Sequence, residues 1–216
     1  MDRAGELRKR MVREQLLDRG IRDPLVLQAM VKVPRERFVP EEWQQYAYAD
    51  SPLPIGQDQT ISQPYVVAWM IEALEPTPED RVLEVGTGSA YGAAVLSRIV
   101  RTVYTIERHK ELAAAAERRL AELGYANVHV RHGDGTLGWP EEAPFDGIVV
   151  TASGPQIPRP LREQLSVGGR LVIPVGQTAS SQELVRLHRI SETETRRENL
   201  GSVRFVPLVG KGGWNG

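Results

Sequence analysis

The chain has 216 residues, of which 41% are hydrophobic, and it contains no cysteine. This size and composition favour one domain with a sizeable core, and the missing cysteines exclude disulfides, thiolate nucleophiles and zinc–thiolate sites. With 27 basic and 28 acidic residues the net charge is -1, so no global field favours nucleic acid or an anionic membrane as a partner.

The first 75 residues are predicted to be mainly helical. A helix is expected over residues 5–19, with Gly20 as its stop signal, and a second one begins at Asp23-Pro24 and ends before Pro34. A third short helix is expected over Glu41–Tyr46. Residues 50–56 hold two prolines and are expected to form an extended loop. The charged N-terminus resembles no signal peptide, so the expected location is the cytoplasm.

From residue 81 onward, short apolar runs alternate with helical segments. Strands are predicted at residues 81–85, 102–107, 127–132, 145–152 and 170–175, and helices at 93–100, 109–123 and 158–165. This alternation predicts a parallel, doubly wound α/β sheet over residues 76–216, with helices on both faces. Residues 183–190 and 202–208 are predicted to form an antiparallel hairpin at the sheet edge, joined by a charged turn over 192–199.

A glycine-rich loop follows the first predicted strand of this sheet. Doubly wound sheets bind ligands at the carboxyl ends of their strands, where Glu84, Gly86 and Gly88 stand. Glycine permits positive φ and lets the backbone approach a ligand closely. Glu107 ends the next strand, about 20 residues further on, where a carboxylate can accept hydrogen bonds from two ribose hydroxyls.

Several interpretations of this loop compete. It can be a structural tight turn. A dinucleotide site is disfavoured because Tyr91 stands where the Gly-x-Gly-x-x-Gly pattern needs a small residue, and a P-loop lacks its Gly-Lys-Ser/Thr ending. S-adenosylmethionine, a nucleoside without a pyrophosphate, fits better, since Glu84 can hold its cationic methionine end. Asp134, after the third strand, either accepts from the adenine amino group or forms an Asp-Gly turn.

Several motifs resemble the protein-L-isoaspartate O-methyltransferase family over nearly the whole chain. The most specific is Gly56–Tyr65 (GQDQTISQPY), and the loop at residues 81–91, the Gly133-Asp134-Gly135 segment and Phe205–Leu208 (FVPL) follow the family pattern. The resemblance implies a single Rossmann-like, S-adenosylmethionine-dependent methyltransferase domain over residues 1–216. It also implies isoaspartyl-containing peptides and proteins as substrates, S-adenosylhomocysteine as product, repair through a succinimide, and a monomer.

Carried over by position, the resemblance implies the site residues. Ser62 and Thr60 are the implied catalytic residues, and the segment from Val206 to Gly210 is implied to help close a peptide-binding cleft. The residues implied to bind the cofactor are Gln59, Thr60, Ile61, Ser62, Glu84, Gly86, Gly88, Ser89, Glu107, Arg108, Asp134 and Gly135. No metal site is predicted, because His129 and His132 are three apart on a strand and face opposite sides.

The implied reaction needs alignment rather than a general base. A carboxylate acceptor with a pKa near ~4 is already ionised at neutral pH, and good positioning alone can contribute ~7–11 kcal/mol. The Ser62 hydroxyl can donate to one acceptor oxygen. Its alternative role is the N-cap of a helix that begins near Pro64, and both roles can hold together.

Two residues depart from the family pattern. Ala90 stands where many members have a third glycine, which costs roughly 1 kcal/mol at positive φ; we expect it to be harmless, inside the first helical turn. Asp58 adds a negative charge near the expected cleft. Two other functions stay open: a related carboxyl O-methyltransferase acting on another peptide or a small carboxylate, and a module that binds S-adenosylmethionine without catalysis.

Overall fold

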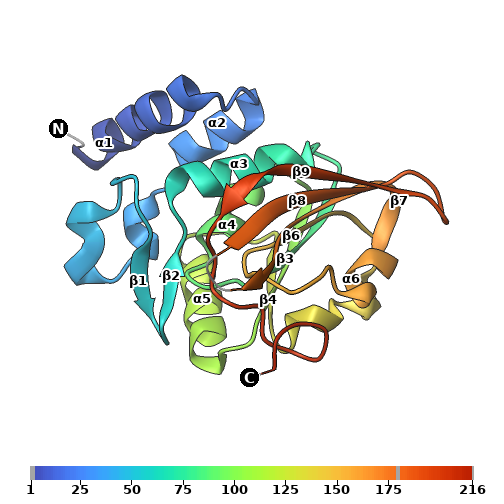
Figure 1. Cartoon of the computed structure of the whole chain (residues 1–216). Coiled ribbons are helices and arrows are strands. Elements are labelled where there is room, and N and C mark those ends of the chain that lie inside the picture. The colour runs from blue at the N-terminus through green and yellow to red at the C-terminus, as the bar shows by residue number, and fades with distance from the viewer. Residues whose placement is uncertain (1–2, 179–180, 216) are drawn as a thin grey trace.

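A mostly parallel sheet forms the centre of the protein, which is described here by a computed structural model over residues 3–178 and 181–215. The seven strands lie in the order β5-β4-β3-β6-β7-β8-β9 (Figure 1). They are β3 (Arg81–Val85), β4 (Thr102–Glu107), β5 (Val128–His132), β6 (Phe145–Val150), β7 (Leu165–Thr178), β8 (Ser181–Arg189) and β9 (Thr195–Val203). The pairs from β5 to β7 are parallel and the last two pairs are antiparallel, which confirms the predicted doubly wound sheet with an antiparallel edge.

Alternate residues of the central strands enter two separate hydrophobic clusters. In β3, Val82 belongs to the cluster that includes the N-terminal helices, and Leu83 belongs to the other cluster. Val149 and Ile148 divide in the same way in β6. Because successive side chains of a strand point to opposite faces, these strands are buried on both sides and read as continuous apolar runs.

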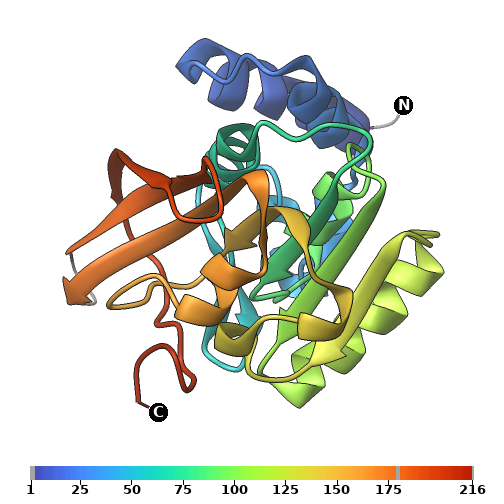
Figure 2. The same cartoon turned by 90° about the vertical axis from the view of Figure 1, so that its right-hand side faces the viewer.

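Helices cover both faces of the sheet (Figures 1 and 2). The first face carries α3 (Pro64–Leu74), α4 (Tyr91–Leu96) and α5 (Lys110–Glu122), and α6 (Arg159–Glu163) contacts β7 on the other. Short 3-10 turns, η5 (Gly135–Leu137) and η6 (Pro140–Glu142), follow β5. The predicted helices thus exist, although α4 begins two residues earlier than the predicted Ala93.

The N-terminal part is helical but less regular than predicted. It contains α1 (Arg3–Met11), the π-helical η1 (Val12–Leu16), η2 (Leu17–Arg19), α2 (Pro24–Lys32), and the 3-10 segments η3 (Arg35–Phe38) and η4 (Glu41–Tyr46). Helical winding runs without a break from Arg3 to Arg19, as predicted for residues 5–19, but its second half changes from α to π and 3-10 winding. Gly20 ends it at φ 103°, and the Asp23 carboxylate caps α2 by accepting from Leu25 N and Val26 N, as predicted.

A small hairpin occupies part of the predicted extended loop. β1 (Leu53–Gly56) pairs with β2 (Gln59–Ile61), and its turn residues Gln57 and Asp58 have φ of 53° and 54°. Positive φ at both central residues is the signature of a type I′ turn, which usually carries Asn-Gly or Asp-Gly. The prediction of a loop failed because Gln-Asp does not carry that signal.

The C-terminal hairpin exists with shifted bounds. The turn between β8 and β9 spans only residues 190–194, and β9 already begins at Thr195, inside the predicted turn. Residues 195–199 are all exposed. Charged side chains are typical of an edge strand, where they prevent pairing with another chain. The charged residues that were predicted to form a turn therefore belong to the edge strand β9.

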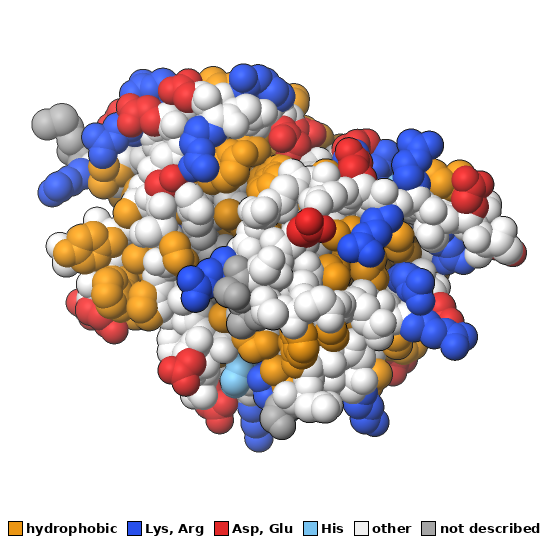
Figure 3. All heavy atoms as spheres, in the orientation of Figure 1, with side chains coloured by type: hydrophobic (Ala, Val, Ile, Leu, Met, Phe, Trp, Pro, Cys, Tyr) orange, Lys and Arg blue, Asp and Glu red, His pale blue; other side chains and the backbone are white. Residues whose placement is uncertain are grey.

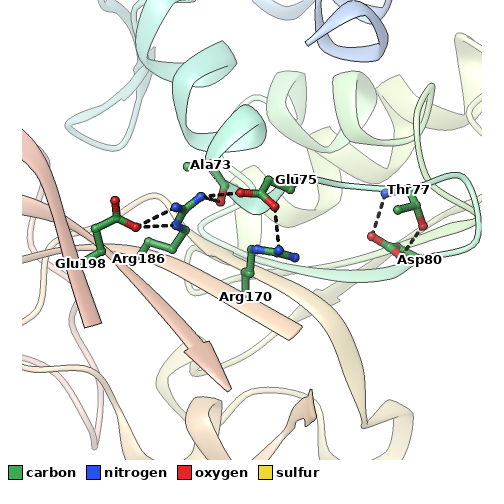
Figure 4. Close-up of polar contacts among 7 residues, drawn as sticks. All are labelled: Ala73, Glu75, Thr77, Asp80, Arg170, Arg186 and Glu198. Carbon is green, nitrogen blue, oxygen red and sulfur yellow. Dashed lines mark hydrogen bonds and ion pairs between the residues drawn. The ribbon is translucent and has the colours of Figure 1, made fainter. Parts of the chain in front are cut away.

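A network of ion pairs joins the end of α3 to this hairpin (Figure 4). Glu75, which ends α3 at φ 50°, accepts from Arg170 of β7 at 2.6 Å and from Arg186 of β8 at 2.8 Å. Arg186 also pairs with Glu198 of β9 at 2.7 Å. The network holds the C-terminal end of α3 on the sheet, and α3 begins at the candidate site.

Charges of both signs are mixed over the face shown in Figure 3. Among the described residues, no helix combines the length and apolarity needed to cross a membrane.

Candidate active site

A cavity lies at the carboxyl edge of the sheet, between the strand ends and the β2–α3 connection. Its wall brings together eleven of the predicted site residues: Gln59, Thr60, Ile61, Ser62, Glu84, Gly86, Gly88, Ser89, Glu107, Arg108 and Gly135. Val206–Val209 of the tail also line it. Asp134 and Asp58 are not part of this wall.

The glycine loop lets the backbone pass close to its neighbours. Gly86 has φ 97°, and a Cβ there would come within 2.3 Å of the Thr151 hydroxyl oxygen. Gly88 has φ 51° and faces Ile55 of the β1–β2 hairpin. No side chain fits at Gly86, so the loop is packed tightly against the end of β6 while its inner surface borders the cavity.

Ala90 does not lie inside the first turn of α4. It is the N-cap of that helix, with φ 70° and ψ 13°, and it is fully buried. The expectation that alanine is harmless here is therefore wrong. The left-handed conformation costs a non-glycine residue roughly 1–2 kcal/mol, and the chain carries this strain at the junction between the glycine loop and α4.

Glu84 is a buried carboxyl at the head of the loop, with 2% exposure. It accepts a hydrogen bond from the Thr105 hydroxyl at 2.7 Å, and Thr105 lies 2.6 Å from the hydroxyl of Thr87. Burial raises the pKa of Glu84 to about 8, the charge of Glu107 raises it as well, and the hydrogen bond from Thr105 opposes both. A cation bound in the cavity would favour the ionised form.

Glu107 lies beside the loop at the end of β4 and is 4% exposed. Its carboxylate accepts from Gly88 N and from His109 N, both at 2.9 Å. Each carboxylate oxygen has a second lone pair, so both can still accept from a ligand. The neighbouring His109 Nε2 is buried without a hydrogen-bond partner among the described residues.

Ser62 lies between β2 and α3 with its hydroxyl uncommitted. The N-cap of α3 is Gln63, without a side-chain cap, so the alternative role of Ser62 as the cap is wrong. Its backbone carbonyl accepts from Arg35 at 2.8 Å. Within the described residues the Ser62 hydroxyl makes no hydrogen bond, and it is therefore free to donate to a ligand.

Asp134 is engaged elsewhere. Its Oδ1 accepts from the backbone N and the hydroxyl of Thr136, and its Oδ2 accepts from Lys211 N at 2.8 Å. Asp134 thus caps η5 and ties the tail to the sheet edge; only the adjacent Gly135 reaches the cavity. Its predicted contact with adenine stays a prediction.

Several residues of the wall were not predicted from the sequence, among them Thr87, His109 and Thr151. Thr151 directly follows β6 and donates to Gly86 O at 2.8 Å. Because the carboxyl ends of parallel strands meet at one edge, the residue after each predicted strand was a candidate by the same rule that selected Glu107.

A second cavity adjoins the first. The two share Thr60, Ser62, Thr151 and Val206. The outer cavity is also lined by aromatic and basic side chains, namely Tyr65, Trp69, Phe205, Arg19 and Arg204. Arg19 lies 3.9 Å from the centre of the Tyr65 ring and pairs with Asp50 at 2.6 Å. Ser62 therefore lies where an inner and an outer chamber meet.

Comparison with known proteins identifies a family and several relatives that are similar to this chain. The family described as protein-L-isoaspartate(D-aspartate) O-methyltransferase matches residues 7–213. Protein-L-isoaspartate O-methyltransferase 1 of Geotalea uraniireducens is 62% identical and covers 96% of this chain and 94% of its own length. The Pelotomaculum thermopropionicum enzyme of the same name is 59% identical over 99% of this chain and 93% of its own.

Solved structures agree in fold. A protein-L-isoaspartate O-methyltransferase superposes with a TM-score of 0.87 at 29% identity, over 95% of this chain and 67% of its own. A Plasmodium falciparum structure described as a protein-L-isoaspartate O-methyltransferase, in complex with S-adenosyl-L-homocysteine, gives a TM-score of 0.80 at 27% identity, over 94% and 98%.

We predict that Glu84 makes the ligand-free protein less stable as the pH rises. Its pKa of about 8 in the folded state exceeds the ordinary value of 4.5, so the folded protein binds this proton more tightly than the unfolded chain. Glu84 therefore adds stability below about pH 4.5 that is lost as the pH rises through about 8. Urea unfolding across this range measures the effect.

The Glu84→Gln variant keeps an acceptor for Thr105 but cannot titrate. It should show a flatter pH profile than the wild type and a higher free energy of unfolding at about pH 8. Glu117→Gln, at an exposed position of α5, is the matched control and should keep the wild-type slope. Parallel profiles for Glu84→Gln and the wild type would contradict the assignment.

Proposed function

Since the chain belongs to the protein-L-isoaspartate O-methyltransferase family, we propose that it transfers a methyl group from S-adenosylmethionine to the free carboxylate of L-isoaspartyl residues in damaged proteins. As a member, the protein is an S-adenosylmethionine-dependent carboxyl methyltransferase. One observation carries the proposal: the Thr60–Ser62 segment and the Gly86–Gly88 loop line the same cavity. Donor and acceptor can therefore meet there.

The wall of the inner cavity suits S-adenosylmethionine. A Cβ at Gly135 would lie 2.4 Å from a side-chain carbon of Val85, and one at Gly86 would lie 2.3 Å from the Thr151 hydroxyl oxygen, so the wall requires glycine at both positions. Among the described residues of the wall, Glu84 and Glu107 are two buried acids and Arg108 is the one lysine or arginine. Such a site disfavours phosphates and favours a ligand with a sulfonium and an ammonium group. When bound, this cofactor supplies an electrophilic methyl group.

The residues of the chain then have to align the acceptor. The substrate carboxylate needs no base, so we assign Ser62 the task of donating to one of its oxygens and leaving the other free to attack. Thr60, exposed beside it, is proposed as a second donor. Val206–Val209 close the cavity from the tail side, and excluding water strengthens the attraction between the reacting charges.

The outer chamber is the proposed entrance for the peptide. Its aromatic residues offer apolar surface to the residues that flank an isoaspartate, and its arginines attract a carboxylate toward Ser62. The proposed ribose contact is Glu107 and the proposed contact for the methionine part is Glu84. For Asp134, only the free lone pair of Oδ2 is left to meet adenine. A single domain, a monomeric state and a cytoplasmic location stay predictions.

A paired-peptide assay tests the function. We expect labelled S-adenosylmethionine to transfer a base-labile methyl ester to a synthetic peptide that contains one isoaspartate, and not to the same peptide with normal aspartate. Equal transfer to both peptides would indicate a less specific carboxyl methyltransferase. Binding of the cofactor without any transfer would indicate a non-catalytic module.

For Ser62→Ala we predict a fall of about 10–100-fold in kcat/KM for the isoaspartyl peptide, because a hydrogen bond to a charged group contributes about 1.5–3 kcal/mol. Since no described residue loses a hydrogen bond, the free energy of unfolding should stay unchanged. Steady-state kinetics, with calorimetry of cofactor binding, checks this. Wild-type turnover in the variant would remove Ser62 from the reaction.

For Glu107→Gln we predict a Kd for S-adenosylmethionine about tenfold or more above the wild-type value, since the ribose loses a charged acceptor. Gln keeps one oxygen for Gly88 N or His109 N, which makes it milder than alanine. Titration calorimetry measures the change, with Glu117→Gln as the control. An unchanged Kd would exclude the ribose contact.

A further inference from the structure

Arg35 is a buried cation without a carboxylate partner. It begins η3, has 0% exposure, and makes no ion pair among the described residues. Burial lowers its pKa to about 10, so it is still charged at neutral pH. Removing a charge from water costs several kcal/mol unless other groups compensate. The groups that contact the Arg35 guanidinium therefore indicate which part of the structure this buried charge holds in place.

Backbone carbonyls and one ring take the place of a counter-ion. The Arg35 Nε donates to Ala47 O at 2.8 Å, and its Nη2 donates to Ser62 O at 2.8 Å. The guanidinium lies 4.8 Å from the centre of the Tyr91 ring. Nη1 is buried without a hydrogen-bond acceptor among the described residues. One side chain thus links η4, the Ser62 connection and the first residue of α4.

The nearby acid does not neutralise this charge. Glu36 accepts hydrogen bonds from Arg8 at 3.2 Å and from the hydroxyl of Tyr48. Arg8 also donates to Tyr48, so these three residues form a cluster separate from Arg35. The contacts of Arg35 are therefore directional hydrogen bonds from a planar fork to carbonyls, which a lysine, with one compact ammonium, cannot reproduce.

Among the described residues, no side chain other than Arg35 makes a hydrogen bond to Ser62. Its side chain makes no hydrogen bond in the described structure, and Gln63 caps α3 without a side-chain bond. Tyr91 follows Ala90, which joins the cofactor loop to α4. Arg35 therefore contacts both sides of the proposed reaction: the carbonyl of the acceptor-binding residue and the helix that follows the donor-binding loop.

We propose that Arg35 is a positioning residue for methyl transfer, which fixes the Ser62 peptide relative to the cofactor loop through its hydrogen bond to the Ser62 carbonyl. The proposal rests on the proposed function, since it assigns Arg35 an effect on the same reaction. Arg35 lines neither cavity and touches neither reactant. Its loss should therefore act on turnover and leave cofactor affinity unchanged.

The test compares Arg35→Lys with the wild type. We expect kcat for a synthetic isoaspartyl peptide to fall about 10–100-fold, since a displacement of about 1 Å at a reacting group has an effect of this size. The Kd for S-adenosylmethionine should stay within about twofold. Arg81→Lys is the matched control, because Arg81 also donates to a carbonyl and lies over a tyrosine ring, but at the other end of β3.

A double-mutant cycle separates positioning from general packing. If Arg35 acts through Ser62, then adding Arg35→Lys to Ser62→Ala should change kcat by less than about threefold. The same loss in both backgrounds, a parallel loss of cofactor affinity, or full turnover in Arg35→Lys would each overturn the proposal. If the wild type itself does not methylate the peptide, the proposed function has failed instead.

A measurement on the wild type covers the case in which the variant does not fold. Protein labelled with nitrogen-15 arginine should show slowly exchanging Arg35 guanidinium protons whose resonances shift when the isoaspartyl peptide is added to the complex with S-adenosylhomocysteine. Rapid exchange with solvent, or no shift on addition of the peptide, would overturn the proposal.

Discussion

The burial of Glu84 and Glu107 at one edge of the sheet sets the chemistry of the inner cavity. Both carboxylates are nearly inaccessible, and the charge of Glu107 adds to burial in raising the pKa of Glu84. For Glu84 the hydrogen bond from Thr105 only partly compensates for burial, while Glu107 accepts from the backbone of Gly88 and His109. A cationic ligand would favour the ionised form of Glu84, so this loop suits a sulfonium donor better than a pyrophosphate.

The sheet provides only half of the reaction site. The acceptor side comes from the β1–β2 hairpin and the Ser62 connection, which belong to the N-terminal part of the chain. Two contacts bring this part to the loop: Ile55 faces Gly88, and the Arg35 guanidinium lies over the ring of Tyr91, the first residue of α4. At its far end, α3 is held on β7 and β8 by Glu75. The geometry needed for methyl transfer thus depends on docking of the N-terminal part.

The sheet could be predicted because the pattern that marks each of its strands lies within a few consecutive residues. Apolar runs marked the strands, and Glu84 and Glu107 followed from the rule that ligands bind at strand ends. Three features could not be predicted in this way. Ala90 adopts positive φ because tertiary packing overrides its preference for helix, and the Gln57-Asp58 turn lacks its usual residues. The Arg35–Ser62 contact joins residues 27 apart in sequence, which no periodic pattern encodes.

Three features that lower stability lie at or beside this cavity. Ala90 stores backbone strain, Glu84 is a buried acid, and Arg35 is a buried cation without a carboxylate partner among the described residues. Each would be selected against in an ordinary core, where an apolar residue or a glycine fits without cost. Glu84 borders the cavity directly, Ala90 follows the loop that lines it, and Arg35 lies behind the Ser62 connection. Because strained or buried polar residues are often found at functional sites, these three residues agree with the proposal that the reaction takes place between the glycine loop and Ser62.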